Sequence, residues 1–235
     1  MVKIIGISGR KQSGKNTSAN YIVGDILKRK SMIYESSINR SGQLEIKTQN
    51  SDGEIGWGVL DVLRKDNEFT SYAEVGIWPY VKIYHFADYL KRICVDLFDL
   101  TADQVYGSDE DKNTDTPYGM TAREFLQYLG TDVMRNIKDT IWVDVTIKTI
   151  LSEQSEVAII PDVRFPNEVE AIHKAGGSVI RLTRDTFNSN HHCEKSLDSD
   201  AFNWDNFDYV IDNNNSEISE LCNKLGAINK LWRAE

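Results

Sequence analysis

Two glycines and a lysine near the N-terminus have the spacing of a backbone loop that wraps a phosphate group. Gly9, Gly14 and Lys15 match the pattern GxxxxGK within the segment GRKQSGKNT. An apolar segment precedes this loop and a helical pattern follows it, which is the context that gives the spacing its meaning. Glycines allow backbone N–H groups to turn toward phosphate oxygens, and the lysine ammonium neutralises their charge. A glycine-rich turn with an exposed lysine is the alternative interpretation.

The same loop supplies candidates for a metal ion and for a second phosphate. The position after Lys15, where a hydroxyl usually holds Mg²⁺, is Asn16, and Thr17 follows, so either side chain is a candidate ligand. Lys11 is a cation inside the loop that can lean over a transferring phosphoryl group, although a solvated lysine gives the same pattern. The residues predicted to bind ATP are Gly9, Gln12, Ser13, Gly14, Lys15, Asn16 and Thr17.

A second polar pair follows a buried strand pattern in the segment IIPDVRFPNE, residues 159–168. It places Asp162 and Arg164 at the C-terminal end of that strand, where open α/β sheets build their sites. Asp162 is a candidate to order Mg²⁺-bound water or to fix a substrate cation, and Arg164 is a candidate to clamp a phosphate with two hydrogen bonds. An ion pair between the two side chains is the alternative.

A capping box and an apolar stripe predict a helix that begins at Thr121. The Thr121 hydroxyl can accept a hydrogen bond from the third helical N–H while Glu124 reaches back. The stripe covers about a third of the helical circumference. It consists of Ala122, Phe125, Leu126, Leu129, Val133 and Ile137.

Polar side chains recur every four residues beside this stripe, at Arg123, Gln127, Thr131 and Arg135. Guanidinium and amide groups are what phosphate and base recognition require. By helical geometry Arg135 has turned away from the Arg123 side by about 120°. Arg123 and Gln127 are therefore the preferred candidates, while a solvated helix face would have the same composition.

Residues 184–200 form a polar segment after an apolar strand pattern, which suits a lid that excludes water from bound phosphates. A surface loop without a role is the alternative. The basic residues beside and within it are Arg181, Arg184, His191, His192 and Lys195. Arg184 is a predicted catalytic residue, together with Lys11, Lys15 and Arg164. The adjacent histidines cannot both face one ion from a regular strand or helix, so structural zinc is not expected.

The bulk composition narrows the class of protein. The 235 residues include 36 acidic and 27 basic side chains, for a net charge of −9, which repels a nucleic-acid polymer but not a small nucleotide. Three cysteines without a CxxC pair indicate a reducing cytosol rather than a disulfide framework. No signal-peptide pattern and no apolar run near the roughly 20 residues of a membrane span are present, so we expect a cytoplasmic protein.

Strand and helix patterns alternate along most of the chain, which predicts an α/β fold with a parallel sheet covered by helices on both faces. We expect one domain, residues 1–235. Residues 31–80 interrupt the alternation with a predicted β-hairpin around NSDG and a short helix at residues 59–65. The expected strands are residues 2–8, 81–86, 157–160, 179–182 and 209–211, and the other expected helices are residues 17–30, 89–98, 139–151, 166–175 and 216–231, with one more from Thr121.

Taken together, these segments resemble the phage-type deoxynucleoside monophosphate kinases, within the P-loop kinases that include dephospho-CoA kinase. The resemblance is spread across most of the chain and implies a three-layer P-loop kinase fold. It also implies Mg²⁺-dependent transfer of a phosphoryl group from ATP to a deoxynucleoside 5′-monophosphate, giving the diphosphate and ADP. The segments that carry it are SGRKQSGKNT, YHFADYLK, LQYLGTDVMR with Trp142 following, PDVRFPNE and HHCE.

The resemblance implies roles for individual residues and shows two departures from the family pattern. The position after the P-loop lysine is commonly acidic in the family, whereas this chain has Asn16, and Tyr89 stands where proline often precedes a hydrophobic residue and lysine. The acceptor nucleotide is expected to contact Lys11, Lys91, Arg123, Gly130, Trp142, Asp162, Arg164 and Glu168, to which the helical pattern adds Gln127 and Thr131.

Two other functions fit the same sequence. One keeps the fold but changes the acceptor to dephospho-CoA or another small phosphorylated metabolite. The other is a P-loop module that binds a nucleotide without acceptor chemistry, against which the arginine-bearing helix argues. Residues 31–80 have no counterpart in the family pattern and are expected to shape either the acceptor site or a homodimer interface. If the chain is phage-encoded, its expected location is the host cytoplasm.

Overall fold

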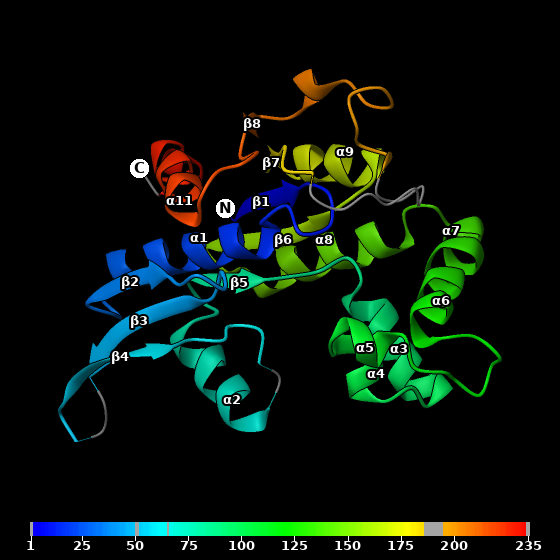
Figure 1. Cartoon of the computed structure of the whole chain (residues 1–235), viewed down its shortest axis with the longest axis horizontal. Helices are drawn as coiled ribbons and strands as arrows, with labels where there is room; N and C mark the ends of the chain where they lie inside the picture. The colour runs from blue at the N-terminus through cyan, green and yellow to red at the C-terminus, as the bar shows by residue number, and fades with distance from the viewer. Residues whose placement is uncertain (1, 50–51, 65, 186–194, 234–235) are drawn as a thin grey trace. The chain divides into compact units, whose positions relative to one another are not determined.

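The structure is a computed structural model that describes residues 2–49, 52–64, 66–185 and 195–233 of the chain. The chain packs into two compact units, drawn in Figure 1. The first is formed by the described residues of Met1–Tyr84 and Ile150–Glu235, and the second by His85–Thr149. The first unit holds the P-loop segment, and the second holds the arginine-bearing helix.

A five-stranded sheet organises the first unit, and every strand pairing in it is parallel. This sheet, flanked by helices, confirms the predicted α/β fold. All five strands expected for it from the sequence are present, and β6 extends three residues beyond the prediction. In spatial order the strands are β5 (Val81–Ile83), β6 (Val157–Val163), β1 (Lys3–Ser8), β7 (Ser178–Leu182) and β8 (Tyr209–Ile211).

Helices pack against this sheet because its strands are apolar on both faces. The main ones are α1 (Lys15–Arg29), α9 (Pro166–Lys174) and α11 (Ile218–Ala227), together with the C-terminal end of α8 (Ile141–Glu153). The last predicted helix is shorter than expected, since α11 is followed by a separate 3₁₀ turn at Asn229–Leu231. Another 3₁₀ turn, Trp204–Asn206, precedes β8.

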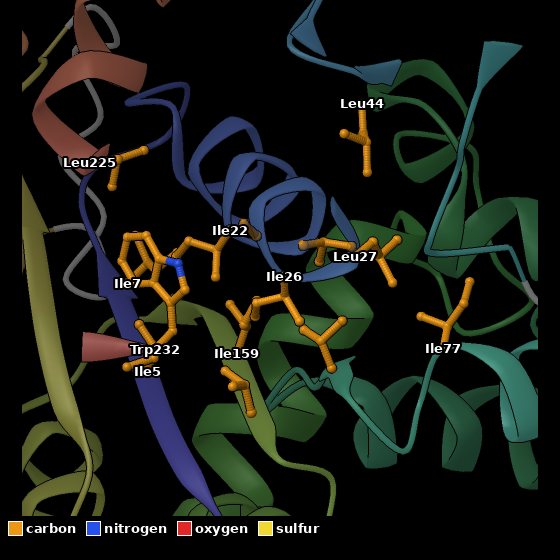
Figure 2. Packing of buried hydrophobic residues seen from close by; sticks show 14 of the residues in the cluster. Ile5, Ile7, Ile22, Ile26, Leu27, Leu44, Ile77, Ile159, Leu225 and Trp232 are labelled. Carbon is orange, nitrogen blue, oxygen red and sulfur yellow. The ribbon is translucent and has the colours of Figure 1, made fainter. Parts of the chain in front are cut away.

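The core lies between α1 and one face of the sheet. Ile22 and Ile26 of α1 point toward the strands that carry Ile5 and Ile159, with the Trp232 indole beside them (Figure 2). All five side chains are at most 3% exposed. The packing fixes the position of the helix that begins at the end of the P-loop segment.

The opposite face of the sheet is covered by α9. A Cβ placed on Gly6 of β1 would lie 2.7 Å from Cδ1 of Ile172, a residue of α9 that is fully buried. Because both faces of β1 are covered, its sequence reads as a continuous apolar run instead of an alternating one.

Residues 31–80 form a separate antiparallel sheet and a helix. The elements are β2 (Glu35–Ile38), β3 (Leu44–Gln49), β4 (Ile55–Val59) and α2 (Asn67–Gly76), and the predicted hairpin is the β3–β4 pair. The short helix predicted at residues 59–65 is wrong. The helix begins at Asn67 instead, because the Asp66 carboxylate accepts a hydrogen bond from Phe69 N at 3.0 Å and the Phe69 ring joins the core.

The insertion packs directly on α1. Asn20 Nδ2 donates to the carbonyl of Gly42, in the turn between β2 and β3, at 2.9 Å. A Cβ placed on Gly24 would lie 2.7 Å from Cδ1 of Leu44, so glycine is what allows β3 to approach the helix this closely. The insertion is therefore part of the packing around the P-loop helix.

The second unit is helical. Its elements are α3 (Asp88–Phe98), α4 (Ala102–Tyr106), α5 (Asp109–Lys112), α6 (Ala122–Gln127), a π-helical segment at Tyr128–Val133, α7 (Met134–Ile137) and most of α8. Residues 109–115 form an acidic run, DEDKNTD, whose first four residues are α5.

The predicted capping box is confirmed, but the predicted buried stripe is wrong at its end. Thr121 Oγ1 accepts from Glu124 N at 3.3 Å, while Glu124 Oε2 accepts from Thr121 N at 2.8 Å. Ile137, placed on the stripe by an α-helical period, is 74% exposed. The π-helical turn has more residues per turn than an α-helix, so every side chain after it is rotated relative to the prediction.

Gly177 provides a test of the close packing of β1. A Cβ at this position would lie 2.6 Å from the Ile4 carbonyl oxygen and 2.8 Å from Ile4 Cβ, and backbone atoms cannot move aside cheaply. We expect Gly177→Ala to lower the free energy of unfolding by about 1–3 kcal/mol. Gly58→Ala is the matched control, because a Cβ there meets nothing within 4 Å. Equal denaturation midpoints for the two variants would contradict this packing.

Candidate functional site

The P-loop segment connects β1 to α1 at the carboxyl edge of the sheet. Gly14 is the N-cap residue of α1 with φ +99°, a conformation that favours glycine, and no side chain caps this end of the helix. Ser13 N donates to the Arg10 carbonyl at 3.1 Å, which closes the loop on itself. The first N–H groups of α1 thus lie at the end of this loop without a side-chain cap, and such a helix N-terminus favours an anion.

Two observations show that this loop fits a phosphate group. Lys15 Nζ donates to the carbonyls of Gly9 and Arg10, both at 2.6 Å, which holds its ammonium against the loop. Ser13 Oγ is buried and has no hydrogen-bond partner among the residues that the structure describes. A buried hydroxyl without a partner is costly, and an oxygen of a bound phosphate would supply one.

Asp162 and Arg164 lie beside the loop, as the sequence predicts. Val163 of β6 pairs with Ser8 of β1, the residue directly before Gly9, so the two flanking side chains are on the neighbouring strand at the same sheet edge. Both are half-buried. The strand order changes direction around β1, and such switch points are where open α/β sheets bind ligands.

Glu168 holds the turn that carries Arg164. Its side chain is 2% exposed, and Oε2 accepts from the backbone N–H groups of Arg164 at 2.7 Å and Phe165 at 3.1 Å. These contacts cap α9 and fix the position of the Arg164 backbone. The resemblance placed Glu168 at the acceptor nucleotide, which stays a prediction beside this structural role.

Arg10 and Arg181 are held together by one carboxylate. Asp198 accepts from Arg10 at 2.5 Å and from Arg181 at 3.1 Å, and Arg181 also donates to Ser8 Oγ at 3.0 Å. The hydrogen bond that Arg10 donates to Asp198 raises the pKa of Arg10 above its ordinary value, whereas desolvation by burial acts to lower it. Arg181 is 4% exposed, so it belongs to the core beneath the loop and not to a solvent-facing lid.

Of the predicted lid, residues 184, 185 and 195–200 are described, and residues 186–194, with both adjacent histidines, lie outside the described residues. Arg184 donates from Nε to the Asn213 carbonyl at 3.1 Å and from its guanidinium to the Ser216 carbonyl. Asn213 was missed by the sequence reasoning. The sequence signal for it is its place two residues after the apolar run at residues 209–211.

In the second unit, Arg123 is paired. It donates to Asp109 at 2.7 Å and to Asn113 at 3.0 Å, so the acidic run at residues 109–115 holds this guanidinium. Lys91 Nζ lies 4.9 Å from the centre of the Tyr106 ring, a cation–π contact. Both cations are thus oriented by neighbours on α4, α5 or the turn after α5.

Lys11 lies in the loop of the first unit, and the other predicted acceptor residues of the second unit lie around the π-helical segment. Trp142 is 4% exposed and donates from Nε1 to the Gly130 carbonyl at 2.9 Å, which ties α8 to that segment. Gln127 and Thr131 are half-buried. Thr131 lies within the π-helical turn and Gln127 directly before it, so their relative direction does not follow the α-helical spacing of four.

Asn16 is exposed and Thr17 half-buried, and with Asp162 they offer only oxygen donors, the set that suits Mg²⁺. Thr17 Oγ1 also lies against the insertion, 2.4 Å from where a Cβ on Gly42 would stand. In the described part of the chain, no group of three or more His, Cys, Asp and Glu side chains is gathered as in a metal centre.

No described helix is long and apolar enough to cross a membrane.

Comparison of the sequence with known proteins identifies the family of the chain. Residues 90–225 match the family model of deoxynucleotide monophosphate kinase. A protein of Acanthamoeba polyphaga mimivirus named as a deoxynucleotide monophosphate kinase is 34% identical over 157 residues, which cover 60% of this chain and 78% of that protein. The chain belongs to the deoxynucleotide monophosphate kinase family.

A second relative supports the assignment over a shorter stretch. The deoxynucleoside-5′-monophosphate kinase of Escherichia phage T5 is 36% identical over 56 residues, which cover 23% of this chain and 22% of that protein. The family match confirms the resemblance given by the sequence segments and identifies the chain as a nucleotide kinase that acts on small-molecule substrates. The matched residues begin at 90, so the match does not include the P-loop.

Asp198 provides a test of the contacts beneath the loop. Asp198→Ala leaves the buried Arg181 without its carboxylate, so we expect it to lower the free energy of unfolding by about 3 kcal/mol. Asp200→Ala is the matched control, because it removes the same charge two residues away at an exposed position. Denaturant titration of both variants measures the difference, and equal stabilities would show that Asp198 does not stabilise Arg181.

Proposed function

We propose that the protein transfers the γ-phosphoryl group of Mg²⁺-bound ATP to a deoxynucleoside 5′-monophosphate, giving the diphosphate and ADP. The observation that carries the proposal is the closed GxxxxGK loop at the switch point of a parallel sheet, in a chain of this kinase family. The family supports the acceptor class, and the loop supports the donor.

The P-loop binds the donor phosphates in this proposal. Backbone N–H groups from Gly14 to Thr17 donate to phosphate oxygens, and the Ser13 hydroxyl gains a partner. Lys15 exchanges its two carbonyl partners for oxygens of the β and γ phosphates. Lys11 and Arg164 stabilise the negative charge on the transferring group, and Arg184 supplies a further guanidinium from the end of β7.

Mg²⁺ neutralises phosphate charge when it is bound with ATP. Asn16 or Thr17 would hold the ion directly or through its waters, and Asp162 would hold its coordinated water. All three are oxygen donors in the first unit. Their role is to orient the ion and the phosphates. None of them donates or accepts a proton in the proposed reaction.

The acceptor is bound by the residues that the resemblance and the helical pattern name. We propose that Lys91 and Arg123 contact its phosphate, and that Gln127, Gly130, Thr131 and Trp142 shape the pocket for its base and sugar. Because the attacking 5′-phosphate oxygen is already anionic, no general base is required. Catalysis then rests on positioning and charge neutralisation.

Lys15 tests the donor site. We expect Lys15→Ala to lower kcat/KM for ATP by at least about 10³-fold, because the loop loses the ammonium that binds the β and γ phosphates. Lys28→Ala, an exposed lysine near the end of the same helix, is the control and should retain activity. A coupled assay of ADP release measures both, and near-normal turnover by Lys15→Ala would defeat the mechanism.

An acceptor panel tests the substrate class. We expect ATP-dependent ADP release with at least one deoxynucleoside monophosphate among dGMP, dTMP, dCMP and a modified dCMP, and none with dephospho-CoA. Direct detection of the deoxynucleoside diphosphate by chromatography identifies the product. Turnover with dephospho-CoA alone would move the chain to another acceptor, and tight ATP binding without any turnover would indicate a binding module.

A further inference from the structure

Asn213 is a buried side chain that joins three segments of the first unit. It follows β8 and is 0% exposed. Its side-chain Nδ2 donates to the Ser13 carbonyl at 2.8 Å, and its Oδ1 accepts from the backbone N–H of Arg184 at 2.9 Å. One amide therefore connects the P-loop, the end of β7 and the end of β8.

The backbone of Asn213 is fixed as well. Its N–H donates to Thr183 Oγ1 at 3.3 Å, and its carbonyl accepts from Arg184 Nε at 3.1 Å. The side chain is thus held on a rigid support when it reaches the P-loop. A primary amide is suited to this position because it presents one donor and one acceptor at the same end of a short side chain.

The hydrogen bond from Asn213 to the Ser13 carbonyl also affects the neighbouring N–H group of the P-loop. The Ser13 carbonyl and the Gly14 N–H belong to one planar peptide group, in which the two bonds point in opposite directions. A hydrogen bond that fixes the carbonyl on one side therefore fixes the direction of the N–H on the other. Gly14, with φ +99°, has few side-chain constraints of its own, so this orientation depends on contacts from outside the loop.

We propose that Asn213 is a positioning residue that orients the Ser13–Gly14 peptide so that the loop is preformed for the donor nucleotide. The inference rests on the proposed binding of ATP at this loop. Asn213 touches neither ATP nor the transferring phosphate in this role. It acts through the peptide that presents the Gly14 N–H.

Asn213→Asp is the sharpest test because it keeps the shape and exchanges the Nδ2 donor for an oxygen acceptor facing the Ser13 carbonyl. We expect the Kd for ATP, measured by calorimetry, to rise about tenfold or more, while the KM for the acceptor changes less than about twofold. Asn215→Asp is the matched control, since it adds the same charge at an exposed position two residues away and should leave both constants unchanged.

The pH dependence of Asn213→Asp, measured where the variant is folded, tests whether the missing donor is what weakens ATP binding. Protonation of the introduced carboxyl restores an O–H donor toward Ser13 O, and burial raises the pKa of such a group. The ratio of the variant's Kd to that of the wild type should therefore fall between about pH 8 and about pH 6. If Asn213→Asp does not fold, Asn213→Ala removes the same donor, and we expect its Kd for ATP to rise at least about fivefold.

The outcomes distinguish this inference from the proposed function. If the wild type binds ATP and Lys15→Ala does not, but folded Asn213→Asp or Asn213→Ala keeps wild-type affinity, the positioning role is wrong and the donor site stands. A lower melting temperature with unchanged ATP affinity in the folded fraction would likewise reduce Asn213 to a structural contact. If the wild type itself does not bind ATP, the proposed donor site fails.

Discussion

The pairing of β1 between β6 and β7 is the constraint on which the first unit depends. It brings the end of β1, and hence the start of the P-loop, next to Val163 on one side and Arg181 on the other. Three strand ends that are far apart in sequence then contribute side chains to one sheet edge. The apolar contacts of α1 with the same sheet hold the other end of the loop. A flexible glycine-rich segment is in this way fixed at both ends by rigid elements.

Several cationic side chains lie at this sheet edge, and hydrogen bonds to specific partners fix their positions. Arg10 and Arg181 share the carboxylate of Asp198, and Lys15 is held by two loop carbonyls. Arg181 is buried in that arrangement and serves the structure, whereas Lys15 donates to the backbone carbonyls of Gly9 and Arg10, which solvent or a phosphate can replace. A similar distinction applies in the second unit, where Asp109 and Asn113 orient Arg123. The sequence alone does not distinguish a buried cation that serves the structure, such as Arg181, from one proposed to bind phosphate, such as Lys15.

The sequence predicted the fold well wherever local and tertiary requirements agree. The five central strands, the hairpin and the Thr121 capping box follow from apolar runs, turn residues and hydrogen-bonding side chains within a few positions of one another. The errors occur where distant contacts decide the outcome. The helix of the insertion begins at Asn67 because Phe69 reaches the core, and Ile137 is exposed because a π-helical turn precedes it. The Asp66 N-cap is a local signal that the prediction missed, whereas the burial of Phe69 and the π-helical turn have no local signature in the residues concerned.

The sequence by itself determined that the GxxxxGK segment lies between a strand and a helix, and that Asp162 and Arg164 lie at the carboxyl end of a buried strand. These depend on residue types and spacings that have few structural solutions. Only the tertiary structure decided that Glu168 caps α9, that Arg181 lies beneath the loop, and that Asn213 reaches the Ser13 carbonyl across 200 positions of chain. A long-range hydrogen bond requires two segments to be folded together, and no pattern within either segment specifies its partner.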